Sequence, residues 1–207
     1  MVSIVNYGMG NIGSIANMFK KLNVPTQIIS TPDEVMKAKK ILLPGVGAFD
    51  AAMRKIKELN LTESLIYKAN QEKIPFLGIC LGMQLLTHRS DEGVEKGLSL
   101  IDAETLSFKK VLDLNQFKVP HMGWSLCKIV NQQVKLVDGF DMFDEVRFYF
   151  VHSYYVKCKN SSNVFMETNY GIDYASAIFQ DNIYGAQFHP EKSHKFGMKL
   201  FENFSKV

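Results

Sequence analysis

The chain has 207 residues, of which 46% are hydrophobic and 22% charged, and its net charge is only +3. This length predicts one domain spanning residues 1–207, and the hydrophobic content is enough for a sizeable core. Lysines and acidic residues are interspersed along the chain, which argues against a surface that binds nucleic acid. We expect the longest cationic run, Lys37 to Lys40, to form a solvated face.

The number and spacing of the cysteines indicate the cellular compartment in which the protein works. Cys80, Cys127 and Cys158 are too few for a disulfide framework and lack the C-x-x-C spacing of a zinc site. The N-terminal stretch has no basic segment followed by an apolar one, so no signal peptide is predicted. No apolar run approaches the roughly 20 residues of a transmembrane helix. We therefore expect a cytoplasmic protein with no membrane segment and no bound metal.

The first 86 residues alternate between strand-like and helix-like segments. Buried strands are predicted at four short apolar runs: 2–6, 26–30, 40–43 and the run that starts at Pro75. Thr31-Pro32-Asp33-Glu34 has the pattern of a helix start with a capping box. A helical pattern that breaks near Asn60 continues to about Lys73. Strands that alternate with helices predict right-handed crossovers and a parallel sheet covered on both faces.

The pattern changes after Leu86. Antiparallel strand pairs are predicted from five short segments: 98–108, 123–130, 146–156, 164–168 and 175–179. The segment 182–189 is expected to return to the sheet, and 193–206 to form a closing helix. The predicted fold class is therefore α/β, an open, mostly parallel twisted sheet with helices on both faces and antiparallel strands in the C-terminal half.

The run Gly78-Ile79-Cys80-Leu81-Gly82 places a cysteine at the apex of a strand-to-helix turn. It is the G-x-S-x-G nucleophile elbow with sulfur in place of oxygen. The turn brings backbone segments together, and a Cβ at position 78 or 82 would clash there. The helix N-terminus that follows favours a thiolate at Cys80. A buried structural cysteine beside a packing glycine is the alternative at this point.

A second stretch, from Gln187 to Ser193, carries an imidazole and a carboxylate two residues apart. In extended backbone His189 and Glu191 point to the same face, and Pro190 biases His189 toward that geometry. A carboxylate beside an imidazole sets its tautomer and stabilises the imidazolium. Cys80, His189 and Glu191 would together supply the nucleophile, base and orienting group of a triad. Taken alone, His189-Pro190-Glu191 also fits a surface turn.

Pro44-Gly45-Val46-Gly47 follows a predicted buried strand. Two glycines around one residue allow the backbone to turn an N–H group toward a ligand. This turn is a candidate oxyanion-hole donor beside the N–H of Leu81, although an ordinary Pro-Gly turn has the same pattern.

Residues 8–13 match the G-x-G-x-x-G pattern of dinucleotide sites, and Asp33 follows about 20 residues later. Asp33 fits better inside the helix start at Thr31 than as a ribose ligand. We therefore favour a tight strand-to-helix turn, and we expect no cofactor.

Several of these stretches resemble one enzyme family. Three segments of the chain resemble the motifs of class I (triad-type) glutamine amidotransferases: 44–49, 78–86 and 187–193. Three further stretches resemble, more narrowly, the glutaminase subunits of imidazole glycerol phosphate synthases: 6–11, 120–124 and 150–154. The resemblance spans nearly the whole chain, and Pro-His-Met-Gly-Trp at 120–124 is its most specific motif.

The resemblance implies the chemistry of each matching position. Cys80 attacks the side-chain amide of glutamine, and His189, oriented by Glu191, protonates the leaving ammonia and then activates water against the thioester. The implied oxyanion hole consists of Leu81, Val46 and Gly47. The positions implied to hold glutamine are Gln84, Glu92, Ser153 and Tyr154.

The resemblance also implies a partner. Asn11, Trp124 and Lys192 match positions that face a (β/α)8-barrel cyclase subunit, into which ammonia passes for imidazole glycerol phosphate formation in histidine biosynthesis. One alternative is the same glutaminase chemistry serving another synthase, such as a surface-sugar amidotransferase. More distant alternatives are a cysteine peptidase or esterase of related fold and a binding module without activity.

Overall fold

The computed structural model describes the whole chain, Met1–Val207. Its strands are β1 (Val2–Val5), β2 (Thr26–Ile29), β3 (Ile41–Gly45), β4 (Phe76–Cys80), β5 (Ala103–Ser107), β6 (His121–Leu126), β7 (Lys128–Ile129), β8 (Arg147–His152), β9 (Tyr154–Cys158), β10 (Val164–Tyr170), β11 (Ile172–Gln180) and β12 (Ile183–Ala186). Its α-helices are α1 (Ile12–Lys21), α2 (Pro32–Lys37), α3 (Phe49–Glu58), α4 (Leu61–Asn70), α5 (Leu81–Leu85) and α6 (His194–Lys206). Five 3₁₀ turns complete the set: η1 (Phe108–Lys110), η2 (Lys135–Val137), η3 (Phe140–Met142), η4 (Ser161–Asn163) and η5 (Pro190–Lys192).

The main sheet has ten strands, and its path runs β2-β1-β3-β4-β12-β11-β10-β7. From β2 to β12 neighbouring strands are parallel, and β11, β10 and β7 continue antiparallel. The strand β9 pairs with both β11 and β5, while β6 and β8 form a separate two-stranded sheet. The α/β fold class is thus confirmed, with its antiparallel strands in the C-terminal half.

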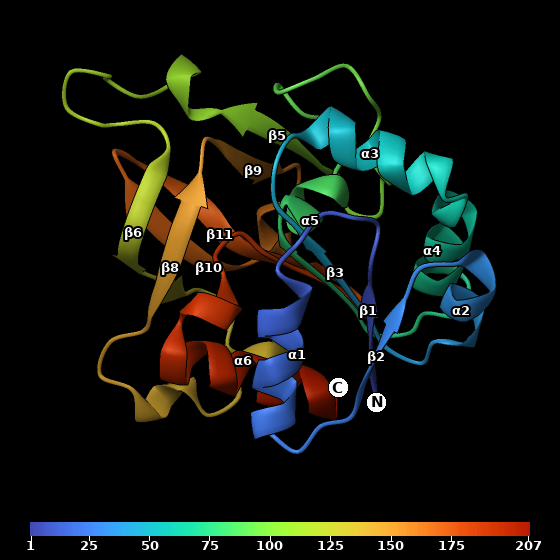
Figure 1. Cartoon of the computed structure of the whole chain (residues 1–207). Helices are drawn as coiled ribbons and strands as arrows, with labels where there is room; N and C mark the ends of the chain where they lie inside the picture. The colour runs from blue at the N-terminus through green and yellow to red at the C-terminus, as the bar shows by residue number, and fades with distance from the viewer.

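Helices cover both faces of the parallel strands (Figure 1). On one face α1 and α6 contribute Phe19 and Phe201, whose rings lie 4.7 Å apart, to a buried cluster of 31 residues. On the other face α2, α3 and α4 help to form a second cluster of 28 residues. Alternation along β4 explains the division, because Leu77 belongs to the first cluster and Phe76 to the second. Both faces of the central strands are therefore buried.

Most elements predicted for the first half are confirmed. The capping box at α2 is complete, since Thr31 accepts from the N–H of Glu34, whose carboxylate accepts from the N–H of Thr31. Asp33 lies in the first turn of that helix, as expected. Asn60 adopts a left-handed conformation between α3 and α4, which is the predicted break. No helix of the structure has both the length and the apolar character needed to cross a membrane.

Three strand predictions in the second half were wrong in extent. Residues 98–102 do not join β5, because the N–H groups of Leu98 and Leu100 bond to carbonyls at the end of α5. The predicted strand 146–156 is two strands that meet at Ser153, one in each sheet. Likewise 123–130 is divided between β6 and β7, which pair with different partners. Local pattern carries no information about which sheet a strand joins.

The solvated face expected at 37–40 was wrong for Lys40. Its side chain is buried, and Nζ donates to the carbonyl oxygens of Phe204 and Ser205 and to an oxygen of Val207. Burial lowers the pKa of the Lys40 ammonium. The last turn of a helix has unpaired carbonyls and a negative dipole end, so a cation there is stabilised. Lys40 therefore fastens α6 to the start of β3.

Replacing this lysine tests the arrangement. Lys40→Met keeps the length of the side chain and removes its three hydrogen bonds, so we expect the free energy of unfolding to fall by about 2 kcal/mol. Urea unfolding followed by circular dichroism measures the change. Lys39→Met is the matched control, because Lys39 is exposed and its loss is expected to matter little. Equal stability of the two variants would contradict this role.

Candidate active site

Cys80 lies at the turn between β4 and α5 with φ 53° and ψ −110°. A non-glycine residue with positive φ is strained, and it is held here by close backbone packing. A Cβ on Gly82 would lie 1.9 Å from the carbonyl oxygen of Leu43, and one on Gly78 would lie 2.5 Å from that of Gly82. The elbow predicted from the sequence is therefore present, and its two glycines are required by contact.

The thiol opens into a cavity of about 330 Å³ at the carboxyl ends of the parallel strands. Ligands of open α/β sheets bind at this end of the strands. The cavity brings together nine of the ten residues expected in the site: Val46, Gly47, Cys80, Leu81, Gln84, Glu92, Ser153, Tyr154 and His189. Glu191, the tenth, contacts His189 from behind the cavity wall.

His189 and Glu191 form a buried pair, with Nδ1 and Oε1 separated by 2.8 Å. The geometry differs from the extended backbone expected from the sequence, since residues 190–192 form the 3₁₀ turn η5. Ser193 closes that turn by donating its hydroxyl to the carbonyl oxygen of His189 at 2.6 Å. The turn, rather than strand alternation, brings the carboxylate back to the imidazole.

The electrostatics of His189 favour its charged form. Burial acts against the imidazolium, but interactions with Cys80 and Glu191 outweigh it and raise the pKa of His189 above its usual range. Its Nε2 is buried and has no hydrogen-bond partner. A protonated Nε2 beside the cavity of Cys80 is arranged to give a proton to a group that leaves from a bound ligand.

The turn at 45–47 contributes Val46 and Gly47 to the lining of the cavity. Gly47 has φ 101°, a value open to glycine, and Val46 is 43% exposed. Tyr7 fixes the start of the turn by donating its hydroxyl to the carbonyl oxygen of Pro44 at 2.8 Å. The start of the turn is therefore fixed by a hydrogen bond. Its tip, which lines the cavity together with Leu81, has the conformational freedom of glycine at Gly47.

The remaining cavity residues are held by specific hydrogen bonds. The carboxylate of Glu92 accepts from the N–H of Phe49 at 2.8 Å, at the N-terminus of α3. The Nε2 of Gln84 donates to the carbonyl oxygen of Tyr154 at 3.4 Å. The carbonyl of Ser153 accepts from the N–H of Phe108. These contacts fix a carboxylate, an amide and a backbone segment around the same space.

One cavity-side residue was given no role from the sequence. Gln187 is fully buried, and its side chain lies between Gln84 and Cys80. The signal was available, because Gln187 and His189 are two apart while Phe188 between them stacks on Phe148 in the core. Alternation about a buried aromatic residue predicts that the residues on either side share the opposite face.

Two of the three surface positions matched to a partner share an aromatic neighbour. Trp124 is 42% exposed, and its ring stacks on that of His194 with centroids 5.6 Å apart. Lys192 lies over the ring of Tyr149, which also meets Trp124 edge to face. Asn11 is half-buried at the start of α1, where its side chain makes no capping hydrogen bond. Trp124 and Lys192 thus share one aromatic surface.

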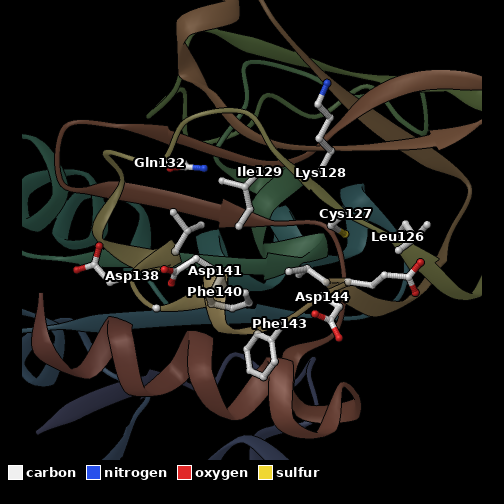
Figure 2. Close-up of a pocket in the computed structure, with 14 residues that line it drawn as sticks. Leu126, Cys127, Lys128, Ile129, Gln132, Asp138, Phe140, Asp141, Phe143 and Asp144 are labelled. Atoms are coloured by element: carbon white, nitrogen blue, oxygen red, sulfur yellow. The ribbon is translucent and has the colours of Figure 1, made fainter.

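A larger cavity of about 510 Å³ lies elsewhere, between the β6–β7 segment and residues 137–146 (Figure 2). Its only thiol is Cys127, whose Sγ lies 3.2 Å from the hydroxyl oxygen of Thr168. Burial raises the pKa of Cys127 to about 12, so this thiol is not a nucleophile near neutral pH. The smaller cavity at Cys80 is therefore the candidate active site.

Comparison with known proteins identifies the family of the chain. The family model for class I glutamine amidotransferases matches residues 3–207. The chain belongs to the class I glutamine amidotransferase family. It is an enzyme of that family rather than a peptidase, an esterase or a binding module.

Its relatives define a narrower group. The imidazole glycerol phosphate synthase subunit HisH 2 of Methanococcus maripaludis is 53% identical over 206 residues, covering 100% of this chain and 99% of that protein. The subunit HisH of Bdellovibrio bacteriovorus is 44% identical and covers 100% of both. The subunit HisH 2 of Pseudomonas aeruginosa is 41% identical, covering 99% of this chain and 98% of that protein.

Solved structures share the fold at low identity. A crystal structure of a glutamine amidotransferase superposes with a TM-score of 0.76 at 12% identity and covers 100% of both chains. The glutaminase domain of Trypanosoma brucei CTPS, solved with acivicin, has a TM-score of 0.67 at 15% identity, covering 99% of this chain and 93% of that one. These likenesses support the fold alone.

The glycines of the elbow provide a test of its packing. Gly82→Ala would place a methyl group against the Leu43 carbonyl, so we expect a loss of at least about 2 kcal/mol in the free energy of unfolding. Gly13→Ala is the control, because its Cβ meets nothing within 4 Å in α1 and alanine favours a helix by about 0.5–1 kcal/mol. Thermal melts of both variants would refute the packing argument if Gly82→Ala unfolded like the wild type.

Proposed function

We propose that the chain is the glutaminase subunit of an imidazole glycerol phosphate synthase and forms a single domain over residues 1–207. It hydrolyses glutamine to glutamate and ammonia, and a cyclase subunit consumes the ammonia. We place this activity in the cytoplasm. The observation that carries the proposal is the buried His189–Glu191 pair on the same cavity as a strained nucleophile elbow.

The geometry supports a thioester route. The thiolate of Cys80 attacks the side-chain carbonyl carbon of glutamine, and the resulting oxyanion faces the N–H of Leu81 and the turn at Val46-Gly47. The imidazolium of His189 gives its proton to the nitrogen, the C–N bond breaks and ammonia leaves. His189 then takes a proton from water, whose oxygen attacks the thioester, and the C–S bond breaks to release glutamate.

Selection of an amino acid follows from the charges at the cavity. Glu92 supplies a carboxylate suited to the α-ammonium group of glutamine, and the side-chain oxygen of Gln84 remains free to accept from the ligand because its nitrogen makes both hydrogen bonds. The backbone of Ser153 and Tyr154 forms the remaining wall. A cavity of about 330 Å³ is at the small end of the range for ligand sites, as a single amino acid requires.

The partner assignment rests on the relatives and on one surface. The relatives are named as subunits of imidazole glycerol phosphate synthase. Trp124 is an exposed aromatic that meets Tyr149 edge to face, and aromatic side chains are enriched at protein interfaces. Lys192 lies over the same Tyr149 ring. We propose that a (β/α)8-barrel cyclase docks here. The same chemistry serving a different synthase would need a different protein on this surface.

Removal of the thiol tests the chemistry. Cys80→Ser should lower glutamine-dependent ammonia release by at least about a thousandfold, because the weaker nucleophile cannot form the thioester. Coupled glutamate dehydrogenase measures the ammonia. Cys158→Ser is the matched control, since that thiol lies away from the cavity and burial raises its pKa to about 12. Unchanged ammonia release by Cys80→Ser would reject the glutaminase.

Mixing experiments test the partner. The chain and the cyclase subunit should form a complex at micromolar concentration, and glutaminase turnover should rise when they associate. Trp124→Ala should weaken the complex at least about tenfold, as expected for a buried interface aromatic. Tyr67→Ala removes an exposed aromatic from α4 and should have no effect. Analytical ultracentrifugation that detects no complex would overturn the partner while leaving the glutaminase intact.

A further inference from the structure

We propose that Gln187 is a positioning residue for the nucleophile, and that its side-chain N–H donates to the sulfur of Cys80 while its oxygen holds Gln84 in place. The inference rests on the proposed role of Cys80. It goes beyond the triad, because neither His189 nor Glu191 takes part in these contacts.

The backbone fixes Gln187 firmly. It follows directly after β12, and its N–H donates to the carbonyl oxygen of Ser176 in β11 at 2.9 Å. The next residue, Phe188, is fully buried with its ring centroid 3.7 Å from that of Phe148. The side chain of Gln187 is therefore pressed toward the active-site face with little freedom to leave it.

A backbone carbonyl determines which end of each amide faces which neighbour. The carbonyl oxygen of Tyr154 can only accept, so the group of Gln84 that lies 3.4 Å from it is Nε2. That Nε2 also lies 3.2 Å from Gln187, which must present its oxygen there. The nitrogen of Gln187 is left facing Cys80, with Nε2 and Sγ 3.8 Å apart. The carbonyl oxygen of Tyr154 thus determines, through Gln84, that Gln187 presents a donor to the sulfur of Cys80.

The same carbonyl is anchored on its other side by a buried imidazole. His152 donates from Nδ1 to the oxygen of Tyr154 at 2.7 Å, so its Nε2 accepts from the hydroxyl of Tyr174. The hydroxyl oxygen of Tyr174 in turn accepts from Nδ1 of His121, whose Nε2 accepts from Ser125. Every donor in this series has one acceptor, and reversing one bond would leave two acceptors facing each other.

Both imidazoles of the series are neutral near pH 7. Burial lowers the pKa of His152 to about 3 and that of His121 to about 4. The tautomers required by the carbonyl of Tyr154 are therefore available without competition from the doubly protonated form. The orientation of Gln84 and Gln187 is therefore kept near neutral pH.

A thiolate gains from such a donor. Hydrogen bonding to the charged form of a group favours that form, and the sulfur of the largely buried Cys80 has a protein donor in Gln187. Gln187 thus gives the sulfur a neutral donor in addition to its interaction with the charged imidazole of His189. This donor stays on the sulfur when the imidazolium gives its proton to the departing nitrogen.

The test is the reactivity of Cys80 itself, measured without glutamine or a partner. Alkylation by iodoacetamide, followed by peptide mass spectrometry to isolate Cys80 from the other cysteines, gives a rate at each pH. In Gln187→Met, which keeps the side-chain length and removes the donor, we expect the midpoint of this profile to rise by about one pH unit. Gln187→Glu, which keeps the shape but replaces the donor with an acceptor, should raise it further.

Gln133→Glu is the matched control, because it makes the same change on an exposed glutamine and should leave the midpoint unchanged. A folded Gln187→Met with the wild-type midpoint would overturn the proposal. So would a shift seen in Gln187→Glu alone, since that result would show repulsion by an added charge rather than loss of a donor.

A second measurement needs no substitution at Gln187. In the wild-type chain labelled with nitrogen-15, the side-chain amide signals of Gln187 should move with the pH midpoint found for Cys80 alkylation, and Cys80→Ser should abolish this movement. Signals that do not respond would overturn the donor. In the glutaminase assay, Gln187→Met should lower kcat at least about tenfold with a smaller change in KM. Because alkylation requires no glutaminase activity, loss of the proposed function and loss of this inference are distinguishable.

Discussion

The site depends on one close approach, between the start of α5 and the end of β3. The carbonyl oxygen of Leu43 lies where a Cβ of Gly82 would be, so no side chain is possible at that position. This contact lets the chain reverse within one residue and holds Cys80 at a positive φ. Because β3 and β4 are parallel neighbours, the same contact places the turn at Val46-Gly47 beside the thiol. The positions of the Cys80 thiol and of the turn at Val46-Gly47 are thus consequences of one packing constraint.

Burial of polar groups then determines how the site is finished. A carbonyl in a dry interior must be bonded, and the bonds that satisfy the oxygen of Tyr154 come from His152 and Gln84. Each of these side chains must satisfy its own second end, which extends the network toward Tyr174 on one side and Gln187 on the other. Because the carbonyl oxygen of Tyr154 can only accept, it determines which group donates in each hydrogen bond of the network. The donors and acceptors along the cavity wall therefore have fixed orientations.

The sequence was sufficient for features governed by local rules. The capping box at Thr31 and the break at Asn60 depend on residues within a few positions of one another, and they were predicted correctly. The elbow was also predicted correctly from its glycine spacing, although the contact that requires Gly82 comes from Leu43 in β3. The sequence was insufficient where the environment of a residue is formed by segments far away in the chain. Lys40 is buried because the end of α6 arrives beside it, 164 residues later in the chain. Gln187 was overlooked because its partners come from β4 and α5, although its alternation with Phe188 indicated the correct face.

The switch of sheets at Ser153 explains how the site is joined to the molecular surface. β8 pairs with β6 in the small sheet, and β9 pairs with strands of the main sheet. Ser153, which lies between β8 and β9, therefore connects the two sheets. β6 exposes Trp124 and, at the next position, supplies Ser125 to the buried imidazole of His121. Adjacent residues of β6 therefore face two environments, because Trp124 is exposed while Ser125 begins the series of hydrogen bonds that ends at the sulfur of Cys80. The surface around Trp124 and the thiol are thus connected through one strand and one continuous set of hydrogen-bonded groups.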